Sequence, residues 1–435
     1  MNELSTVTMH GNLSPIGAGF NLVNTMIGSG ILALPYALKE AGFYFGIFTM
    51  VLSSLLIYVA LNVLVYGGRR AGMYRFESVS EAAMGRTGHH LLTFALAVNS
   101  IGSCISYLII IGDTTSSVAQ HVFGPSIYTS RQATILYTAI GFTLPLLFFR
   151  TLEPLVKPSV LSTLCLPFIV VIVALRGPTY HTTPEPVPKP VLGPSALPAI
   201  GVIAFAYSCT QTSYQSYQTL RHKTLSGWRT ASAFASSLAV VIYLAFSIIS
   251  YQSFGLDTQP NLLNNFDNSD QLANVARVLL AFSLTLTYPM QFYPIRDLFG
   301  EALGLSAQST SREARVKFNL FALAMFVATL VVALAVEDLG FVFKLIGTAA
   351  ASLLVFGLPG IIYLRLVSPY FTSKLAGESS PLLDSTGIDI DEDAKHISEP
   401  STTIMSCFLL VLGFVVFVVG TWTCIQEFVV DYIHK

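Results

Sequence analysis

Long runs of apolar residues follow one another along almost the whole chain, and they constrain the fold more than any other feature. Only 11 % of the 435 residues are charged, whereas soluble domains carry about 25 %. A helix needs about 20 apolar residues to cross a bilayer. The pattern argues against a soluble enzyme, a disordered chain and a nucleic-acid binder. It predicts an all-α polytopic membrane protein with about 11 transmembrane helices, at 15–36, 43–67, 91–119, 133–149, 156–176, 196–220, 229–255, 272–296, 317–336, 340–366 and 404–427.

Lys and Arg residues are shared unequally between the loops, and this predicts the orientation. With a cytosolic N-terminus, 16 of the 23 basic residues lie in inside loops and five lie outside, as the positive-inside rule requires. An odd number of spans then places the C-terminus outside. The predicted parts are a short cytosolic tail (1–14), a ten-helix core (15–366), an acidic flexible cytosolic loop (367–403), and an eleventh helix with a short external tail (404–435).

The first predicted span contains two glycines at mid-membrane depth, Gly28 and Gly30. Each lowers helix stability by about 1 kcal/mol relative to alanine. Backbone groups freed there must be buried or line a cavity. Freed N–H groups suit a carboxylate and freed carbonyls suit a cation. Close helix packing is the alternative interpretation, but the polar neighbours Asn24, Thr25 and Ser29 favour a binding site.

The sixth predicted span is the corresponding place in the second half of the chain. A clean apolar stretch is followed there by a polar run from Tyr207 to Gln215, where a continuous helix would be costly in lipid. Two interrupted segments at matching positions predict an inverted repeat with a site at the midplane. The halves would be 15–176 and 196–366.

Three stretches are characteristic in combination, namely NLVNTMIGSGIL from Asn21, SYLIIIGD from Ser106 and LTLTYP from Leu284. Together they resemble the signature of the amino acid/auxin permease family, most closely its sodium-coupled neutral amino acid transporter branch. The resemblance covers most of 15–366. It implies eleven helices, a LeuT-like core of five plus five helices, and transport of amino acids by alternating access.

The resemblance also implies a sodium site. Asn24 and the carbonyl of Ile27 would face the ion, and Thr287, with Thr285 as a second candidate, would complete the site from the eighth span. On an ideal helix these two threonines point about 200° apart, so both can bind only if the helix is distorted. The alternative is that each hydroxyl bonds to a carbonyl of its own helix.

The same resemblance implies a substrate site around the first break. The substrate carboxylate would meet the backbone of Gly28, Ser29 and Gly30, next to Thr25, and Tyr107 could donate a hydrogen bond to it. The remaining candidates shape the pocket for the substrate side chain; they are Tyr207, Ser208 and Thr210.

Two features bear on the choice between sodium and protons. Relatives often have Cys-His in the sixth span, whereas this chain has Cys209-Thr210, so a proton role for that histidine is absent. The fifth span offers hydroxyl residues, Ser159, Ser162 and Thr163, rather than a basic side chain, which favours sodium. Asp113 is expected near the outer surface, paired with Arg277 or Lys344.

We therefore expect a secondary active transporter of neutral L-amino acids that works by sodium symport and alternating access. A proton-coupled or exchanger-type carrier of a vacuolar or lysosomal membrane is the first alternative, and an amino acid sensor is the second. The sequence lacks HExxH, GxSxG and Walker A motifs, so neither an enzyme nor a bound cofactor is expected. Co-transported Na⁺, with H⁺ as the alternative, is the only expected inorganic partner.

The expected partners are the amino acid substrate and the lipid bilayer, with no nucleic acid. Glu378-Ser-Ser-Pro-Leu-Leu383 matches an acidic dileucine sorting signal, which an adaptor protein would recognise. The membrane would be the plasma membrane or an endolysosomal or vacuolar membrane. A monomer is assumed.

Overall fold

The computed structural model describes residues 11–28, 30–148, 153–180, 187–305, 311–368 and 400–433. Within these ranges the chain is helical, and its single β feature is an isolated bridge between Leu13 and Leu220. The helices are α1 (Pro15–Met26), α2 (Gly30–Ala41), α3 (Phe43–Ala71), α4 (Phe76–Met84), α5 (Arg86–Phe123), α6 (Arg131–Thr138), α7 (Leu144–Leu147), α8 (Glu153–Arg176), α9 (Ala196–Ala206), α10 (Ser213–Gln218), α11 (Leu225–Phe254), α12 (Gln271–Ala302), α13 (Arg312–Ala335), α14 (Leu339–Ile346), α15 (Leu358–Leu366), α17 (Pro400–Val415) and α18 (Thr421–Ile433).

Seven helical stretches among the described residues are long and apolar enough to cross a membrane. An eighth follows if α1 and α2, which meet at an angle of 65°, form one broken span. The other predicted spans fall on α6 and α7, on α8, and on the interrupted pair α9 and α10. Helices therefore occur at every predicted span, while the total of eleven crossings stays a prediction.

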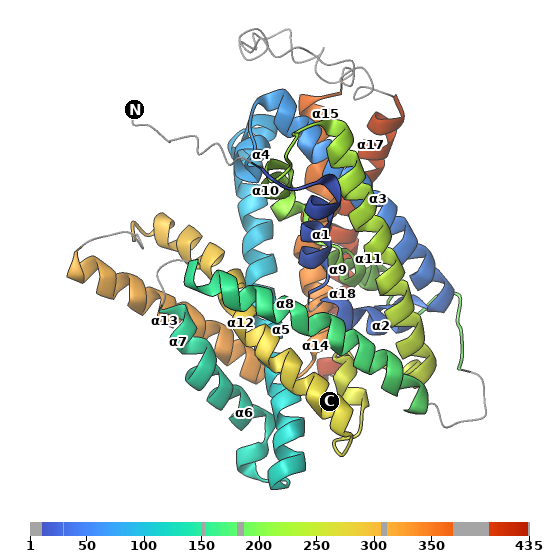
Figure 1. Ribbon diagram of the computed structural model, residues 1–435, viewed down its shortest axis with the longest axis vertical. Helices are drawn as coiled ribbons and strands as arrows, with labels where there is room; N and C mark the ends of the chain where they lie inside the picture. The colour runs from blue at the N-terminus through green and yellow to red at the C-terminus, as the bar shows by residue number, and fades with distance from the viewer. Residues whose placement is uncertain are drawn as a thin grey trace.

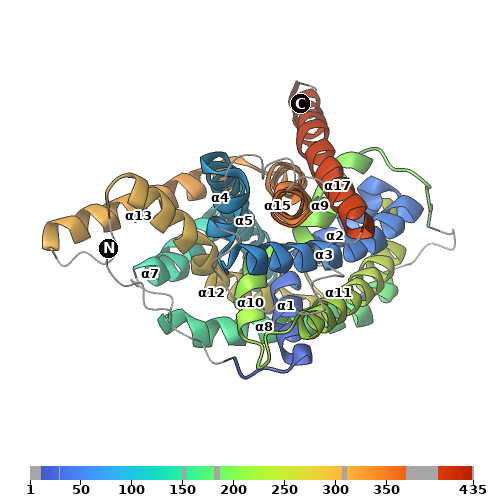
Figure 2. The same cartoon turned by 90° about the horizontal axis from the view of Figure 1, so that it is seen from above.

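The helices form two groups that cross at an angle (Figures 1 and 2). In one group α12 packs against α5 and α8, and α13 packs against α5. In the other group α1 and α3 pack against α11, and α2 packs against α9. The broken helices α1–α2 and α9–α10 thus belong to the same group, so their breaks lie close together.

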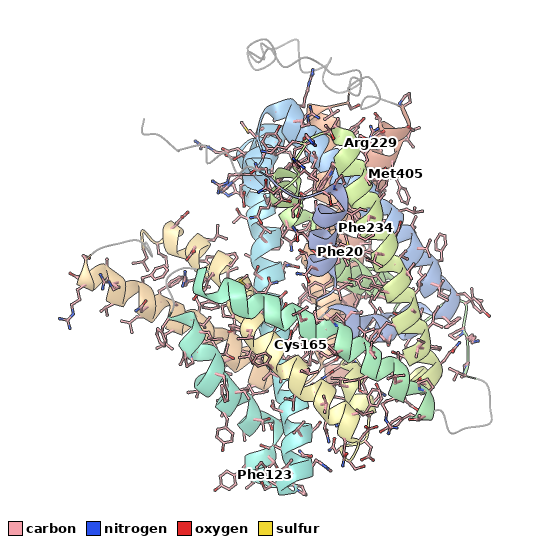
Figure 3. All side chains as sticks on the ribbon, in the orientation of Figure 1. Phe20, Phe123, Cys165, Arg229, Phe234 and Met405 are labelled. Carbon is pink, nitrogen blue, oxygen red and sulfur yellow. The ribbon has the colours of Figure 1, made fainter. Side chains whose placement is uncertain are left out.

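The molecule has two ends, which we name by the helices that mark them in Figure 1. The α4 end holds α4, α10 and the start of α11, and the α6 end holds α6 and the end of α5. Arg229 lies toward the first and Phe123 at the second (Figure 3). The basic residues used for the orientation, such as Arg69 and Arg221, lie toward the α4 end, which is therefore the predicted cytosolic side.

An ion pair joins α5 and α6 at the α6 end. The Nε atom of Arg131 lies 2.7 Å from Oδ1 of Asp113, and Asn264 also donates to this carboxylate. The expected pairing of Asp113 with Arg277 or Lys344 is therefore wrong. Arg277 instead donates to the carbonyls of Leu263, Phe266 and Asp267 and to Asn274. Arg131 reaches Asp113 because α5 and α6 form a hairpin that brings its two arms together.

The last helix packs along α14 and α15 through small residues. A methyl group on Gly413 would lie 2.5 Å from the backbone nitrogen of Gly357, and one on Gly360 would lie 2.6 Å from the carbonyl of Ser406. Such distances leave no room for a side chain, so the backbones are in direct contact. Helices α17 and α18 therefore form one packed unit with α14 and α15.

Candidate functional site

The first helix is interrupted where the glycines predicted a break. Helix α1 begins at Pro15, with Ser14 as its N-cap accepting from the N–H of Gly17, and ends at Met26. Past this end the N–H of Ile27 donates to Val23 at 2.8 Å, and that of Gly28 donates to Met26 at 2.8 Å. Helix α2 starts two residues later at Gly30. Ser29 lies outside the described residues.

The two described glycines at this break have different surroundings. A methyl group built on Gly28 would meet no atom within 4 Å, whereas one on Gly30 would lie 2.9 Å from Cα of Ala206. Gly30 thus allows α2 to approach the end of α9, which is the close-packing interpretation. Gly28 borders open space, so a ligand has room to approach the backbone there.

The second break separates α9 from α10. Helix α9 ends at Ala206, and a short 3₁₀ turn at Thr210–Thr212 precedes α10. Thr210 is fully buried, and its hydroxyl donates to the carbonyl of Leu354 at 2.9 Å. The hydroxyl of Ser208 donates to Oε1 of Gln211 at 3.4 Å. The polar residues of this break are therefore held by bonds within the protein.

Tyr243 of α11 connects the two breaks. Its hydroxyl lies 2.6 Å from the carbonyl oxygen of Met26 and 2.7 Å from that of Ala206, the last residues of α1 and α9. The side chain is fully buried, and its ring meets that of Tyr207 edge-on at 4.9 Å. Sequence reasoning missed Tyr243; the one available signal was a tyrosine at the centre of an apolar span.

The remaining α1 candidates lie on the same helix face or close to it. Asn24 is exposed, and Thr25 is half-buried with its hydroxyl donating to the carbonyl of Asn21 at 3.0 Å. Phe20, one turn before Asn24, packs edge-on against Phe234 of α11 (Figure 3).

The two threonines of the predicted cation site both bond to their own helix. The Thr285 hydroxyl donates to Ala281 at 2.7 Å, and the Thr287 hydroxyl donates to Ser283 at 3.0 Å. Helix α12 is continuous through both positions, so their side chains point in different directions. Thr285 lines a cavity of about 510 Å³ between α5, α6 and α12, and the buried Arg277 also borders this cavity.

The two predicted tyrosines are both buried. Tyr107 of α5 is 7 % exposed, and Tyr207 is fully buried with its hydroxyl donating to the carbonyl of Met50 at 3.2 Å. Among the described residues, no group of three or more His, Cys, Asp or Glu could hold a metal ion. A cation at these breaks would therefore be bound by carbonyl, amide and hydroxyl oxygens. The side chains of Ser159, Ser162 and Thr163 and the segment Glu378–Leu383 lie outside the described residues.

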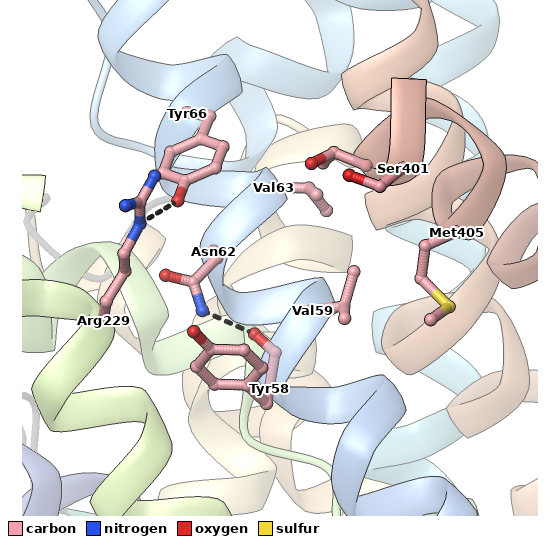
Figure 4. A pocket seen from close by; sticks show the side chains of 9 residues that line it. Tyr58, Val59, Asn62, Val63, Tyr66, Arg229, Ser401 and Met405 are labelled. Atoms are coloured by element: carbon pink, nitrogen blue, oxygen red, sulfur yellow. Dashed lines mark hydrogen bonds between the residues drawn. The ribbon is translucent and has the colours of Figure 1, made fainter. Parts of the chain in front are cut away.

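A separate cavity of about 480 Å³ opens between α3, α11 and α17 near the α4 end (Figure 4). In it the Nε of Arg229 donates to the hydroxyl of Tyr66 at 2.6 Å, and the amide of Asn62 donates to the carbonyl of Tyr58 at 2.7 Å. None of the predicted binding residues lines this cavity, so it is distinct from the site at the breaks.

Comparison with solved structures agrees with this architecture. The fold matches a Na⁺-coupled sialic acid symporter in its substrate-bound outward-open state with a TM-score of 0.52, covering 96 % of this chain and 90 % of the other, at 14 % sequence identity. The predicted fold class, an all-α membrane protein with a LeuT-like core, is therefore confirmed.

Sequence comparison gives the family. The chain is 31 % identical to the putative sodium-coupled neutral amino acid transporter 11 of Mus musculus, covering 94 % of this chain and 84 % of the relative. It is 25 % identical to vacuolar amino acid transporter 2 of Saccharomyces cerevisiae, covering 87 % of this chain and 85 % of the relative. The family model described as "Transmembrane amino acid transporter protein" matches residues 11–386. The chain therefore belongs to the transmembrane amino acid transporter family.

Proposed function

We propose that this transporter moves a neutral L-amino acid together with sodium by alternating access. Its family makes it an amino acid transporter and not an enzyme. The observation that supports the proposal best is the meeting of two helix breaks, joined by Tyr243, beside the open space at Gly28. Helix ends of this kind bind zwitterions well, because N–H groups face the carboxylate and carbonyls face a cation.

The substrate would occupy the first break. Its carboxylate would meet the backbone of Gly28, Ser29 and Gly30, next to Thr25, with Tyr107 as a further donor. The three candidates of the second break would shape the pocket for the substrate side chain, namely Tyr207, Ser208 and Thr210. Since Thr210 already donates to Leu354, its part in this proposal is to fix the pocket wall.

Sodium would lie beside α1, bound by Asn24 and the carbonyl of Ile27, with Thr287 as the first hydroxyl ligand from α12 and Thr285 as the second. The internal bonds of the two threonines are compatible with this role. A hydroxyl that donates to its own helix keeps oxygen lone pairs that accept a cation. Binding of the ion and of the substrate would then strengthen each other to the same degree, as linkage requires.

Uptake of labelled neutral amino acids into proteoliposomes, with and without a sodium gradient, tests the proposal. We expect uptake to depend on the gradient. Thr287→Ala should raise the sodium concentration needed for half-maximal uptake, and Thr285→Ala, on the other side of α12, serves as the matched comparison. Unchanged sodium dependence in both variants would remove α12 from the cation site.

A proton-coupled or exchanger-type carrier of an acidic compartment is the second candidate, and the similarity to a vacuolar amino acid transporter favours it. Uptake that does not depend on sodium but responds to a pH gradient would support this second candidate. Binding of an amino acid without any flux would instead indicate a sensor.

The sorting signal at Glu378–Leu383, the cytosolic N-terminus and the monomeric state also belong to this proposal. Localisation of a Leu382→Ala, Leu383→Ala variant tests whether an adaptor reads the signal.

A further inference from the structure

A group of four polar side chains, three of them buried, connects α2, α9, α14 and α18. The Nζ atom of Lys344 lies 2.6 Å from a carboxylate oxygen of Glu40 and 3.0 Å from one of Glu427. It also donates to the hydroxyl of Ser195 at 3.0 Å, and that hydroxyl donates to Glu427. We call these four residues the lysine clamp.

Two members of the clamp belong to half-helices next to the breaks, namely α2, which follows the first break, and α9, which precedes the second. Glu40 is near the end of α2, and Ser195 is the N-cap of α9. The backbone joins these two positions, because the N–H of Ser195 donates to the carbonyl of Glu40 at 3.1 Å and that of Gly193 donates to Ala41 at 2.7 Å. Helices α2 and α9 are thus tied together as one body.

The other two members sit on the unit formed with the last helix. Lys344 belongs to α14 and Glu427 to α18. The rings of Phe341 and Phe428 stack at 4.1 Å beside them. Together with the close backbone contacts of α17, this places Lys344 and Glu427 on a second body. In the arrangement described here this body also touches α9 directly, because a methyl group on Gly347 would lie 2.2 Å from the carbonyl of Gly201, and the clamp adds a charge group to that contact.

The charge group has two carboxylates for one ammonium. The side chains of Lys344 and Glu40 are 9 % and 11 % exposed, whereas Glu427 is 37 % exposed and borders a cavity of about 550 Å³. The cavity also contacts Asp338, whose carboxylate caps the N–H groups of Gly340 and Phe341. A buried ammonium that loses its only carboxylate is strongly destabilised, and here the second carboxylate prevents that.

We propose that Glu427 is a positioning residue of the transport cycle, which keeps the Lys344 ammonium paired while Glu40 moves away with α2 and α9. The clamp holds the two half-helices in the closed arrangement, and Glu427 lowers the free energy needed to open it. This inference rests on the proposed function, since alternating access is what moves these half-helices against the rest of the protein. It gives the eleventh helix a part in transport.

Substitutions of Glu427 and Glu40 should have different effects on the uptake kinetics. In Glu427→Gln, opening would strand the ammonium, so the maximal uptake rate should fall at least roughly tenfold while KM changes little. In Glu40→Gln, the pair of Lys344 and Glu427 stays intact and α2 is released, so KM should rise more than the rate falls. Glu337→Gln is the matched control, because this exposed carboxylate lies just before α14, the helix of Lys344, and takes part in none of the ion pairs of the described residues.

Distance measurements test the clamp without transport. Spin labels at Leu192 and Val430, which are 63 % and 50 % exposed, report on the two bodies once the five native cysteines are replaced. Glu427→Gln should shift the distance distribution toward the short, closed population, and Glu40→Gln should shift it toward the long one. Identical distributions in all variants would overturn the proposal, even if sodium-coupled uptake holds. A wild-type protein that transports without sodium would instead overturn only the sodium coupling.

A triple variant separates this role from a structural one. Glu40→Gln, Lys344→Met and Glu427→Gln together remove the ammonium that would be stranded, so the rate should recover at least roughly threefold over Glu427→Gln alone. If the clamp only stabilises the fold, the triple variant will be less stable and slower than the single one, and the proposal fails. The quantity compared is the uptake rate of the triple variant divided by that of Glu427→Gln, both measured at equal amounts of protein. Weak expression of Glu427→Gln therefore does not affect the comparison.

Discussion

The two helix breaks have similar polarity in the sequence but different bonding in the structure. At the first break, Asn24 is exposed and Gly28 borders open space. At the second, Tyr207 and Thr210 are fully buried and donate to carbonyls of other helices. The comparison indicates that the first break has open space beside its backbone, whereas the second break is closed by hydrogen bonds within the protein. Tyr243, which touches both, holds the two at a fixed separation.

Removal of the Tyr243 hydroxyl should have the largest effect on this arrangement. In Tyr243→Phe the Ala206 carbonyl loses the Tyr243 donor, while the Met26 carbonyl keeps the N–H of Gly28. We expect a loss of up to about 3 kcal/mol, since a buried acceptor left without a partner costs about 1–3 kcal/mol. Thermal unfolding of the purified protein and uptake rates measure this. Tyr251→Phe, on the same helix, removes a bond to one carbonyl and should have a smaller effect. Equal effects would contradict a connecting role for Tyr243.

A methyl group at Gly30 should push the two breaks apart. In Gly30→Ala the new Cβ would lie 2.9 Å from Cα of Ala206, and overpacking of this kind costs about 2 kcal/mol. Uptake should fall together with thermal stability, because α2 can no longer approach α9. Gly141→Ala, where a methyl group meets no atom within 4 Å, controls for the loss of a helical glycine. Normal stability of Gly30→Ala would show that the contact is not needed.

The rigidity of the second break can be tested at Thr210. Thr210→Val keeps the shape but loses the bond to Leu354, which should lower stability by about 1 kcal/mol. If this residue fixes the pocket wall, the substrate KM should rise. Thr210→Ser retains the hydroxyl and should behave nearly as the wild type. A serine variant as impaired as the valine variant would point to packing of the methyl group instead.

The smallest effect on stability is expected at Gly28. Because a methyl group there meets no atom within 4 Å, Gly28→Ala should change the free energy of unfolding by less than about 0.5 kcal/mol. It should still weaken substrate binding, since the methyl group would occupy the approach to the backbone. Equilibrium binding of a labelled amino acid and thermal unfolding, measured on the same sample, separate the two. Binding at wild-type affinity would place the substrate elsewhere.

The sequence predicted the features that depend on local chemistry. The helical fold and both breaks followed from apolar length, glycine and a polar run, and these signals act within one segment. Features that depend on packing between distant segments were not predictable. Neither the bonds of Tyr243 to two other helices nor the pairing of Lys344 with Glu40 and Glu427 has a local signature. The side of α12 on which Thr285 lies is also set by helix rotation, which tertiary contacts decide.

The wrong partner for Asp113 has the same origin. The prediction looked for a base within the apolar spans, Arg277 or Lys344, whereas the actual partner, Arg131, is the first residue of α6, just past the turn that follows α5. The position of Arg277 along its predicted span could not show that its guanidinium would donate hydrogen bonds to backbone carbonyls. Buried cations need hydrogen-bond acceptors, and these need not be carboxylates.

The contact of Gly413 with Gly357 has a consequence for how the protein is made. The chain is synthesised from its N-terminus, and completed parts fold as they emerge. The first ten predicted spans therefore exist before α17 has been translated, with the groove at Gly357 and Gly360 still uncovered. Closing this groove must wait for α17, so a ribosome that stops before residue 400 releases a protein whose defect lies at the surface where α17 belongs.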